Sequence, residues 1–425
     1  MRIIIIGAGP GGYETAAEAA ARGIEVILVS DGPLGGTCLN EGCIPTKALC
    51  SMDAPDQVRK RAVIEQLAGG ISQLLRSPLI TVVLGKARLA GPHSIDVTPA
   101  NGSEAKHFDA DAIIIATGSV SASLPIPGAD LAIDSSGMLE LTEVPKRLCI
   151  IGGGVIGLEF ASIYRKFGSE VTVLEFCPNI LPRFDVDLAK RLKASLVKRG
   201  ITIETSARVT EIDGSVVRWT KGEKSFGTEA DCILMAVGRR PALKSLNLDD
   251  IGLEYTPRGI VVDENMQTNV PGVYAVGDIT GGIMLAHVAS AQGRRALNHI
   301  CGLKDGINFS VVPAAVFTVP EAACVGLSEE ECEGMEIITG KSNYRANGKA
   351  VASGEPDGWC KIIAEKASGR ILGAHILGAH AADLVHETAT LIALGATVQQ
   401  ARDIIHAHPS LSEVLAAAYE ACRAK

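Results

Sequence analysis

Residues 35–49 read Gly-Gly-Thr-Cys-Leu-Asn-Glu-Gly-Cys-Ile-Pro-Thr-Lys-Ala-Leu, and this stretch decides how the rest of the chain is interpreted. It holds Cys38 and Cys43 with four residues between them. On a regular helix, residues five apart are displaced by roughly 7.5 Å along the axis and face different ways. A disulfide needs Cα atoms within about 7 Å of each other. A Cys38–Cys43 bond therefore requires a bend between the cysteines, which Gly42 can provide.

A helix is predicted to begin beside Cys43 and to run through Lys47 and Leu49, because Pro45 favours the first turn of a helix. Cys43 would then lie at the positive end of the helix dipole, where a thiolate is stabilised. Lys47 would follow one turn later on the same face. The alternative is a pair of buried structural thiols. No metal is expected, since no second Cys or His pair follows at ligand spacing.

The composition is that of a globular protein with several domains. The chain has 425 residues, of which 47% are hydrophobic and 21% charged, and this length suggests about two to four domains. A net charge of −8 argues against nucleic-acid binding, because phosphates attract basic surfaces. The apolar runs are too short to cross a bilayer, so we expect no membrane association.

The cysteines and the first residues bear on the cellular location. The 11 cysteines are odd in number and scattered along the chain, as is typical of reduced thiols in a reducing compartment. Residues 2–6 already resemble a buried strand, so no signal or transit peptide is expected before the fold. We therefore expect a cytoplasmic protein.

A glycine fingerprint follows this first predicted strand and precedes an alanine-rich helix at residues 13–22. The glycines have the spacing Gly-x-Gly-x-x-Gly: Gly7, Gly9 and Gly12. In a dinucleotide-binding fold, the pyrophosphate lies at the N-terminus of the helix that follows such glycines. The alternative is that the glycines serve only a tight turn.

The residue expected to hold the first ribose is unusual. An acidic residue normally follows the fingerprint by about 20 residues and binds the ribose hydroxyls. Here the strand predicted at residues 24–29 leads into Ser30 and Asp31. Ser30 stands where Glu is expected, and Asp31 can take its role from the next position.

The same pattern recurs in the middle of the chain. A strand predicted at residues 148–151 is followed by a second set of glycines: Gly152, Gly154 and Gly157. Glu175 ends the next strand, 23 residues after Gly152. A carboxylate there favours two free ribose hydroxyls and repels a 2′-phosphate, so NAD is expected rather than NADP. The alternative is that Glu175 is a solvated charge at the end of a strand.

Two later segments place polar residues beside turns. The strand predicted at residues 270–276 leads into Gly277 and Asp278, where a carboxylate suits a hydrogen bond to a ligand hydroxyl. From residue 309 the pattern predicts an antiparallel sheet with helices.

Near the end of the chain, His408 and Glu413 flank a Pro-Ser turn, so an imidazole–carboxylate hydrogen bond is possible. A histidine is more often just a satisfied polar group.

Two dinucleotide fingerprints with a cysteine pair after the first resemble the flavin-linked pyridine nucleotide-disulfide oxidoreductases. The resemblance covers nearly the whole chain, and the cysteine stretch is highly specific to that family. Residues 268–278 look like its second FAD-contact motif, and Ala116-Thr117-Gly118 looks like its flavin-to-NAD crossover. Residues 372–378 and 406–413 look most like the branch that oxidises dihydrolipoamide.

The resemblance implies an α/β fold with two Rossmann-like dinucleotide-binding domains, one for FAD and one for NAD, and a C-terminal α+β dimerisation domain. The expected divisions are an FAD domain with the redox disulfide (1–143), an NAD domain (144–262), a return segment that completes the FAD domain (263–309) and the dimerisation domain (310–425).

The resemblance also assigns cofactor contacts. FAD, bound tightly but not covalently, is expected to contact Gly7, Gly9, Gly12, Ser30, Asp31, Gly36, Thr37, Lys47, Ala87, Thr117, Gly118, Asp278, Leu285, Ala286 and His287. NAD is expected to contact Gly152, Gly154, Gly157, Glu175, Val209 and Gly238.

Catalytic roles follow from the same resemblance. Cys43 would face the flavin, and Cys38 would exchange with the substrate. Lys47 and Glu159 would pair beside the flavin. The family is homodimeric, and the histidine of one subunit reaches the disulfide of the other while a glutamate holds it; here these are His408 and Glu413.

The implied activity is the NAD-dependent oxidation of dihydrolipoamide. The expected partner is the lipoyl domain of an acyltransferase or the glycine cleavage H protein. One departure is that the segment between Cys43 and Gly85 is shorter than in the family, which would open the substrate channel. Two alternatives stay open: an FAD-dependent NADH:disulfide reductase for another small thiol or disulfide, and a non-catalytic flavin-bearing sensor.

Overall fold

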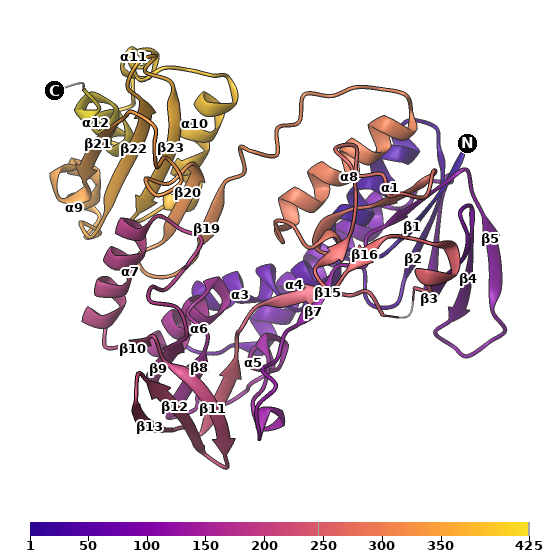
Figure 1. The fold of residues 1–425 in the computed structure, drawn as a ribbon, viewed down its shortest axis with the longest axis horizontal. Helices are drawn as coiled ribbons and strands as arrows, with labels where there is room; N and C mark the ends of the chain where they lie inside the picture. Colours follow the sequence, from indigo (N-terminus) through magenta and orange to yellow (C-terminus); the bar gives the residue numbers. More distant parts are fainter. Residues whose placement is uncertain (245, 424–425) are drawn as a thin grey trace.

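The computed structural model describes residues 1–244 and 246–423 and contains three main sheets with their helices (Figure 1). The first sheet has seven strands in the order β18-β6-β1-β2-β3-β4-β5. Their bounds are β1 (Arg2–Ile6), β2 (Glu25–Ser30), β3 (Ile80–Gly91), β4 (Ser94–Pro99), β5 (Lys106–Asp109), β6 (Ala112–Ile115) and β18 (Val273–Ala275). β1 lies parallel between β2 and β6, and Ile3, Ile4 and Ile5 are fully buried, as in parallel sheets covered on both faces.

Helices α1 (Pro10–Ala21) and α8 (Ala286–Ile300) pack side by side on this sheet (Figure 1). Their close approach depends on glycine. A Cβ on Gly11 would lie 3.1 Å from the backbone oxygen of Ala289, and one on Gly293 would lie 2.0 Å from Thr15 Oγ1. Gly11 and Ala289 both lie in the first turn of their helices. The N-termini of α1 and α8 therefore lie side by side.

The cysteine stretch forms two short helices, α2 (Gly36–Asn40) and α3 (Cys43–Cys50), followed by α4 (Gln57–Leu74). Gly42 precedes α3 with φ −146° and ψ −110°, outside the helical region. The predicted bend at Gly42 and the predicted helix start at Cys43 are both confirmed.

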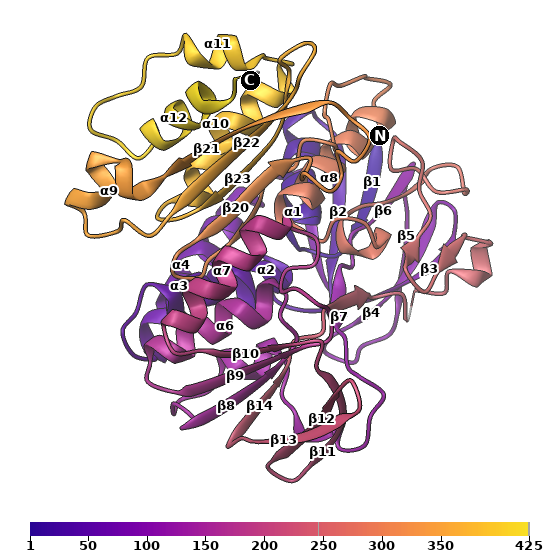
Figure 2. The same ribbon diagram turned by 60° about the vertical axis from the view of Figure 1, so that its left-hand side comes forward.

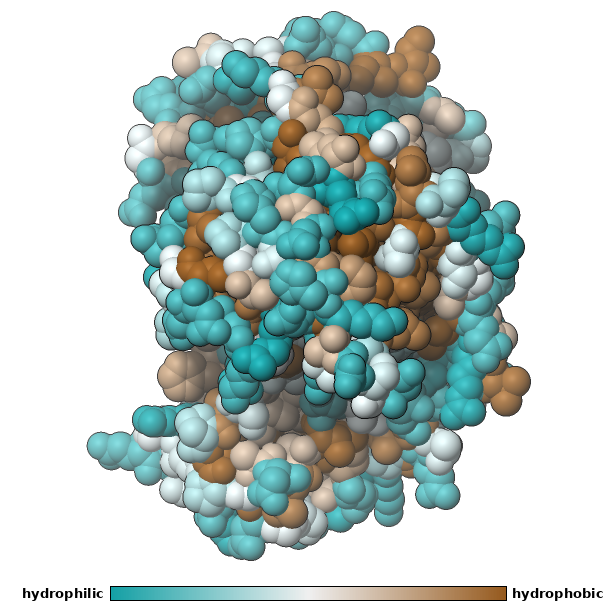
Figure 3. All heavy atoms as spheres, turned by 90° about the vertical axis from the view of Figure 1, so that its right-hand side faces the viewer, coloured by the Kyte–Doolittle hydropathy of each residue, from teal (hydrophilic) through white to brown (hydrophobic). Residues whose placement is uncertain are grey.

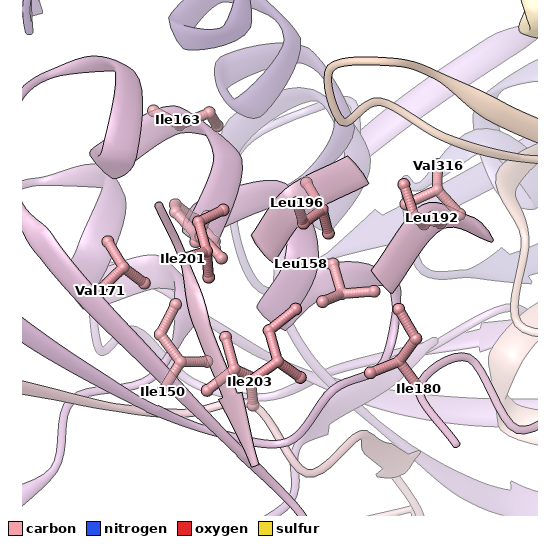
Figure 4. Close-up of a cluster of buried hydrophobic side chains, with 14 of the residues drawn as sticks. Ile150, Leu158, Ile163, Val171, Ile180, Leu192, Leu196, Ile201, Ile203 and Val316 are labelled. Carbon is pink, nitrogen blue, oxygen red and sulfur yellow. The ribbon is translucent and has the colours of Figure 1, made fainter. Parts of the chain in front are cut away.

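The middle of the chain repeats the arrangement with a four-stranded parallel sheet in the order β10-β9-β8-β14. A three-stranded antiparallel sheet, β11-β12-β13, extends from it. The elements are α5 (Ser135–Leu139), β8 (Arg147–Ile151), α6 (Val155–Lys166), β9 (Glu170–Glu175), α7 (Val186–Lys198), β10 (Thr202–Thr205), β11 (Arg208–Asp213), β12 (Val216–Lys221), β13 (Lys224–Glu229) and β14 (Cys232–Met235). Leu192 and Leu196 of α7 pack over this sheet in one core with Val316, from the C-terminal part of the chain (Figure 4).

A two-stranded ribbon connects the first two parts. β7 (Ser119–Ser121) pairs antiparallel with β15 (Arg239–Pro241), so the chain enters and leaves the middle part side by side. Three small elements follow before the chain returns to the first sheet at β18: η2 (Asp249–Ile251), β16 (Tyr255–Thr256) and β17 (Gly259–Ile260). Directly after β18 comes η3 (Gly277–Thr280). η1 (Ala129–Leu131) lies after β7.

The C-terminal part is a five-stranded antiparallel sheet in the order β19-β20-β23-β22-β21, with helices α10 and α12 packed on one face. Its other face lies toward α7 (Figure 2). The bounds are β19 (Ala314–Val316), β20 (Ala322–Gly326), β21 (Ile337–Asn343), η4 (Tyr344–Ala346), α9 (Gly348–Ala352), β22 (Trp359–Glu365), β23 (Ile371–Leu377), α10 (Ala381–Ala393), α11 (Val398–Arg402) and α12 (Glu413–Ala421).

The predicted α/β class, with two Rossmann-like units and a C-terminal α+β unit, is confirmed. Helix α7, strands β10 to β13 and strand β21 were not predicted. Among the described residues, no helix has both the length and the apolar character that crossing a membrane requires. Apolar side chains also gather on one outer face of the molecule (Figure 3).

Candidate active site

One large cavity of about 2290 Å³ lies where the three parts of the chain meet. Both glycine fingerprints, the cysteine helices, the connecting ribbon and strand β19 contribute to its wall. The predicted site residues that line it are Gly7, Gly9, Ser30, Asp31, Gly36, Thr37, Cys38, Cys43, Lys47, Ala87, Thr117, Gly118, Gly152, Gly154, Glu159, Glu175, Val209, Gly238, Asp278, Leu285, Ala286 and His287. Predicted site residues from distant parts of the sequence thus line the same cavity.

Gly12 and Gly157 lie behind the cavity wall and act by permitting close packing. A Cβ on Gly12 would lie 1.8 Å from the oxygen of Gly7, and one on Gly157 would lie 2.0 Å from the oxygen of Gly152. Each helix can therefore approach its turn only because this residue is glycine.

Cys38 and Cys43 are free thiols in this structure, and they are in contact but in different electrostatic surroundings. Hydrogen bonding with Cys38 and the charge of Lys47 lower the pKa of Cys43 to about 7, against burial, which raises it. The pKa of Cys38 is raised, first by the hydrogen bond to Cys43 and then by burial. In the reduced pair the negative charge therefore resides on Cys43.

Lys47 and Glu159 form the predicted ion pair. Lys47 Nζ lies 2.9 Å from Oε2 and 3.0 Å from Oε1 of Glu159. Phe317 was not predicted as a site residue: its backbone N–H donates to Glu159 at 3.0 Å, and its ring centre lies 4.5 Å from Lys47 Nζ. Phe317 directly follows β19, and its only sequence signal is the apolar run around it, which suggests a core residue rather than one that holds an ion pair.

The first ribose position lacks a free carboxylate at the end of β2. Ser30 is buried, and its hydroxyl donates to the backbone oxygen of Gly32 at 2.8 Å. Asp31 is exposed at the cavity. Of the two residues, Asp31 therefore offers the charged group.

Glu175 is buried and organises the second fingerprint. Its Oε2 accepts from the N–H of Gly153 at 2.5 Å, and its Oε1 accepts from the N–H of Cys177 at 2.6 Å. The interpretation of Glu175 as a solvated charge is therefore wrong, because both oxygens are bonded to backbone. Its carboxylate still lines the cavity beside the glycines.

Asp278 belongs to a network that the sequence analysis missed. Its Oδ2 accepts from the hydroxyl of Ser119 at 2.5 Å, and Ser119 Oγ accepts from Arg239 Nε at 2.7 Å. Ser119 and Arg239 directly follow Gly118 and Gly238. Their place after a glycine at the end of a strand is the signal that could have found them.

His408 and Glu413 lie outside this cavity, at the surface of the C-terminal part. His408 Nδ1 is 2.8 Å from Glu413 Oε1, and the histidine side chain is 79% exposed. Hydrogen bonding to His408 lowers the pKa of Glu413. The predicted hydrogen bond is formed, and the imidazole is largely open to solvent.

Fold and site together define an oxidoreductase that binds two dinucleotides beside a pair of thiols. The family described as "Pyridine nucleotide-disulphide oxidoreductase" matches residues 1–293, and its dimerisation domain matches residues 312–419. The chain belongs to this family of enzymes.

Relatives support the assignment along the whole chain. Dihydrolipoyl dehydrogenase of Bacillus subtilis is 37% identical, covering 98% of this chain and 97% of its own length. Dihydrolipoyl dehydrogenase of Chlamydia muridarum is 40% identical, covering 97% and 95%. The structure of the HOCl-induced flavoprotein disulfide reductase RclA from Escherichia coli superposes with a TM-score of 0.91 at 31% identity, covering 100% of both chains. LpdA of Mycobacterium tuberculosis gives 0.90 at 28% identity, with the same coverage.

The cavity fits FAD and NAD, the cofactors of this family. Its volume of about 2290 Å³ is well above the roughly 300–1,000 Å³ of a site for one small ligand. At Gly9 and Gly154, the middle glycine of each fingerprint, a Cβ would meet nothing within 4 Å. The backbone there is open to a pyrophosphate.

Proposed function

We propose that the chain catalyses the NAD-dependent oxidation of dihydrolipoamide, with Cys38 and Cys43 as its redox pair. The observation that carries the proposal is that the two thiols, the Lys47–Glu159 pair and both fingerprints share one cavity. The substrate is supported by the dihydrolipoyl dehydrogenases, which are 37% to 40% identical over nearly their whole length.

The proposed thiol chemistry begins with the Cys38–Cys43 disulfide. A thiolate of dihydrolipoamide attacks Cys38 Sγ, a mixed disulfide forms, and Cys43 leaves as a thiolate. The second substrate thiol then closes the lipoamide ring and releases Cys38 as a thiol. Cys43 is the better leaving group, because its pKa is lowered to about 7.

The electrons and protons must also be carried away. Bound in this cavity, FAD supplies the two-electron chemistry that links the thiols to NAD. The hydrogen bond with Cys38, and after it the charge of Lys47, favour the thiolate of Cys43, and Glu159 holds Lys47 through an ion pair. One substrate thiol must lose a proton at neutral pH, and we assign its acceptance to His408, oriented by Glu413. The net reaction converts dihydrolipoamide and NAD⁺ to lipoamide, NADH and a proton.

We propose that this histidine acts in the other subunit of a homodimer. Support comes from the match to the family's dimerisation domain and from the exposure of His408 outside its own cavity. We also propose a lipoyl-bearing protein as the partner, a cytoplasmic location, and the domain divisions given above from the sequence.

A second candidate is an NADH:disulfide reductase for a different small disulfide. It is favoured by the full-length similarity to RclA, described as a flavoprotein disulfide reductase. It is also favoured by the short helix α3, which ends at Cys50. Turnover with lipoamide against other disulfides separates the two candidates.

The decisive test adds dihydrolipoamide and then NAD to the flavin-loaded protein without oxygen. The first addition should bleach the visible absorbance of the flavin, and the second should restore it. Cys43→Ser should retain the flavin but lose roughly 10³-fold or more of the turnover. Turnover of that variant near the wild-type rate would end the proposal.

A further inference from the structure

A buried lysine connects the C-terminal sheet to the middle part of the chain. The side chain of Lys361, on β22, is 0% exposed. Its Nζ lies 2.7 Å from Asp185 Oδ2, 3.0 Å from Glu329 Oε2 and 3.4 Å from Asp187 Oδ2. The two aspartates begin α7, and the mechanism above uses none of these residues.

The register of the C-terminal sheet explains why a lysine points this way. Cys360 and Ile362, on either side of Lys361, belong to the core beneath α10 and α12. Lys361 therefore faces the opposite way, toward α7. Its register partners are Lys341 on β21 and His375 on β23. A polar row thus crosses the face of the sheet that covers α7.

Asp185 uses both carboxylate oxygens. Oδ1 caps α7 by accepting from the N–H groups of Asp187 and Leu188, at 3.1 Å and 3.2 Å. Oδ2 accepts from Lys361. Burial alone would raise the pKa of Asp185, but His375 and Lys361 hold it below its usual value. A buried carboxylate of this kind is stable only with its partner in place.

Asp185 also ends the segment that borders the NAD side of the cavity. Residues 176–184 join Glu175 to Asp185, and Phe176, Cys177 and residues 181–184 line the cavity. Leu181 has φ +47°, in the left-handed region, and its N–H donates to Gly153 at 3.0 Å. Such strain persists only where the surroundings fix the backbone. This segment is fixed at one end by Glu175 and at the other by Asp185.

We propose that Lys361 is a positioning residue for the NAD site. By compensating the charge of Asp185, it holds residues 176–184 against the second fingerprint from a distant part of the chain. It does not touch the nucleotide itself. The inference rests on the proposed function in one respect, namely that NAD binds at that fingerprint.

The test measures NAD affinity of the flavin-loaded dimer by calorimetry, together with steady-state kinetics. Lys361→Met should raise the Kd for NAD and the KM for NADH about tenfold. Flavin content, kcat at saturating nucleotide and the KM for lipoamide should stay within about twofold. The control is Lys366→Met, just beyond β22, whose Nζ lies 3.5 Å from Glu336 at the surface; it should change nothing. A folded Lys361→Met protein with the wild-type Kd overturns the proposal.

Two further variants separate positioning from a merely structural role. Lys361→Met combined with Asp185→Asn removes the uncompensated charge while Asn still caps α7, so the Kd should return to within about threefold of wild type. A Kd as weak as that of Lys361→Met alone contradicts the charge argument. Should Lys361→Met not fold, Asp185→Asn alone should raise the Kd about fivefold, and an unchanged value overturns the proposal.

The failure of the inference can be told apart from the failure of the proposed function. A wild-type protein that does not bind NAD rejects NAD as the nucleotide, and with it the proposed function. A wild-type protein that binds NAD, with variants that bind it equally well, rejects only the role of Lys361.

Discussion

Cys38 and Cys43 are chemically identical residues that lie in different electrostatic surroundings. Cys43 begins α3 and lies near Lys47, whereas the pKa of Cys38 is raised by its hydrogen bond to Cys43 and by burial. The reduced pair therefore has one fixed place for its charge. The thiolate is the reactive form of cysteine. The difference in pKa therefore suits Cys43 to react as the thiolate and Cys38 to remain a neutral thiol after reduction.

Lys47→Met is expected to raise the pKa of Cys43 from about 7. The variant removes the cation that lowers this pKa and leaves the carboxylate of Glu159, which raises it. We expect an upward shift of about one unit or more, measured by titrating the thiolate absorbance of the reduced protein. The thiolate would then be lost at neutral pH and regained in more basic solution. In Lys166→Met, which removes a surface ion pair with Asp53, the pKa should stay near 7, and the same result in Lys47→Met would contradict this account.

His408→Gln should lower dihydrolipoamide oxidation by about 10²–10⁴-fold, because the proton acceptor is lost. The KM for NAD should not change, since His408 lies outside the cavity of its own chain. A control is His107→Gln on β5, which breaks another surface pair, with Asp96 of β4 at 2.7 Å, and should leave the activity unchanged. A loss of less than about threefold in His408→Gln would remove this residue from the mechanism.

Helices α1 and α6 each begin at a glycine fingerprint and have the same arrangement for binding a phosphate. In each, the last glycine of the fingerprint lets the helix lie against the preceding turn. The helix N-terminus then faces the cavity, where its dipole favours an anion. Because the two units are separate in the fold, they can be disabled one at a time.

Gly157→Ala should abolish NAD binding while the flavin is retained, and Gly12→Ala should do the reverse. In each variant the new Cβ would lie about 2 Å from a backbone oxygen, so the helix must move away from its turn. Flavin absorbance and NAD calorimetry measure the two effects separately. Gly69→Ala in α4, where a Cβ meets nothing within 4 Å, should leave both cofactors bound. Loss of both cofactors from Gly157→Ala would show that the two units are not independent.

The fingerprints and the cysteine stretch could be predicted because their information is local. Gly42, Cys43 and Pro45 lie within one turn of the helix they begin, and the structure confirms that helix. The strand–glycine–helix pattern also fixes which parts of the chain meet at the cavity.

The elements that were missed differ in kind, because α7 has a local sequence signal whereas β21 and the contact of Phe317 depend on distant parts of the chain. Helix α7 has a local signal that was missed: Asp185 caps it, and Leu188, Leu192 and Leu196 recur every four residues on its buried face, which is the pattern of an amphipathic helix. Strand β21 exists through its pairing with β22. In the sequence, Phe317 looks like an ordinary hydrophobic core residue. Its contact with Glu159 depends on the tertiary fold, which brings the two residues together. Long-range pairing of this kind leaves no periodic trace in the sequence.

The C-terminal part presents two highly exposed apolar side chains, one of them three residues before His408. Ile405 is 97% exposed and Leu394 is 78% exposed. Such exposure agrees with the match of residues 312–419 to the family's dimerisation domain. The proposed role of His408 in the other subunit requires that this part of the chain lies at the dimer interface.

Mixed dimers test this arrangement. Cys43→Ser and His408→Gln homodimers should each be nearly inactive. When the two variants are co-expressed, half of the dimers should be mixed, and each mixed dimer should contain one intact site. The preparation should therefore recover about a quarter of wild-type activity. Recovery no greater than the sum of the two inactive proteins would place His408 and Cys43 of the same chain in one site.

The pairing of β18 with β6 has a consequence for biosynthesis. These neighbours in the first sheet are far apart in the sequence, because the entire middle part is inserted between them. While the ribosome is still adding the intervening residues, the open edge of β6 has no neighbour, and such edges invite pairing with other chains. The first sheet can therefore be completed only after Val273–Ala275 has been synthesised, whereas the inserted part is available to fold before the unit that surrounds it.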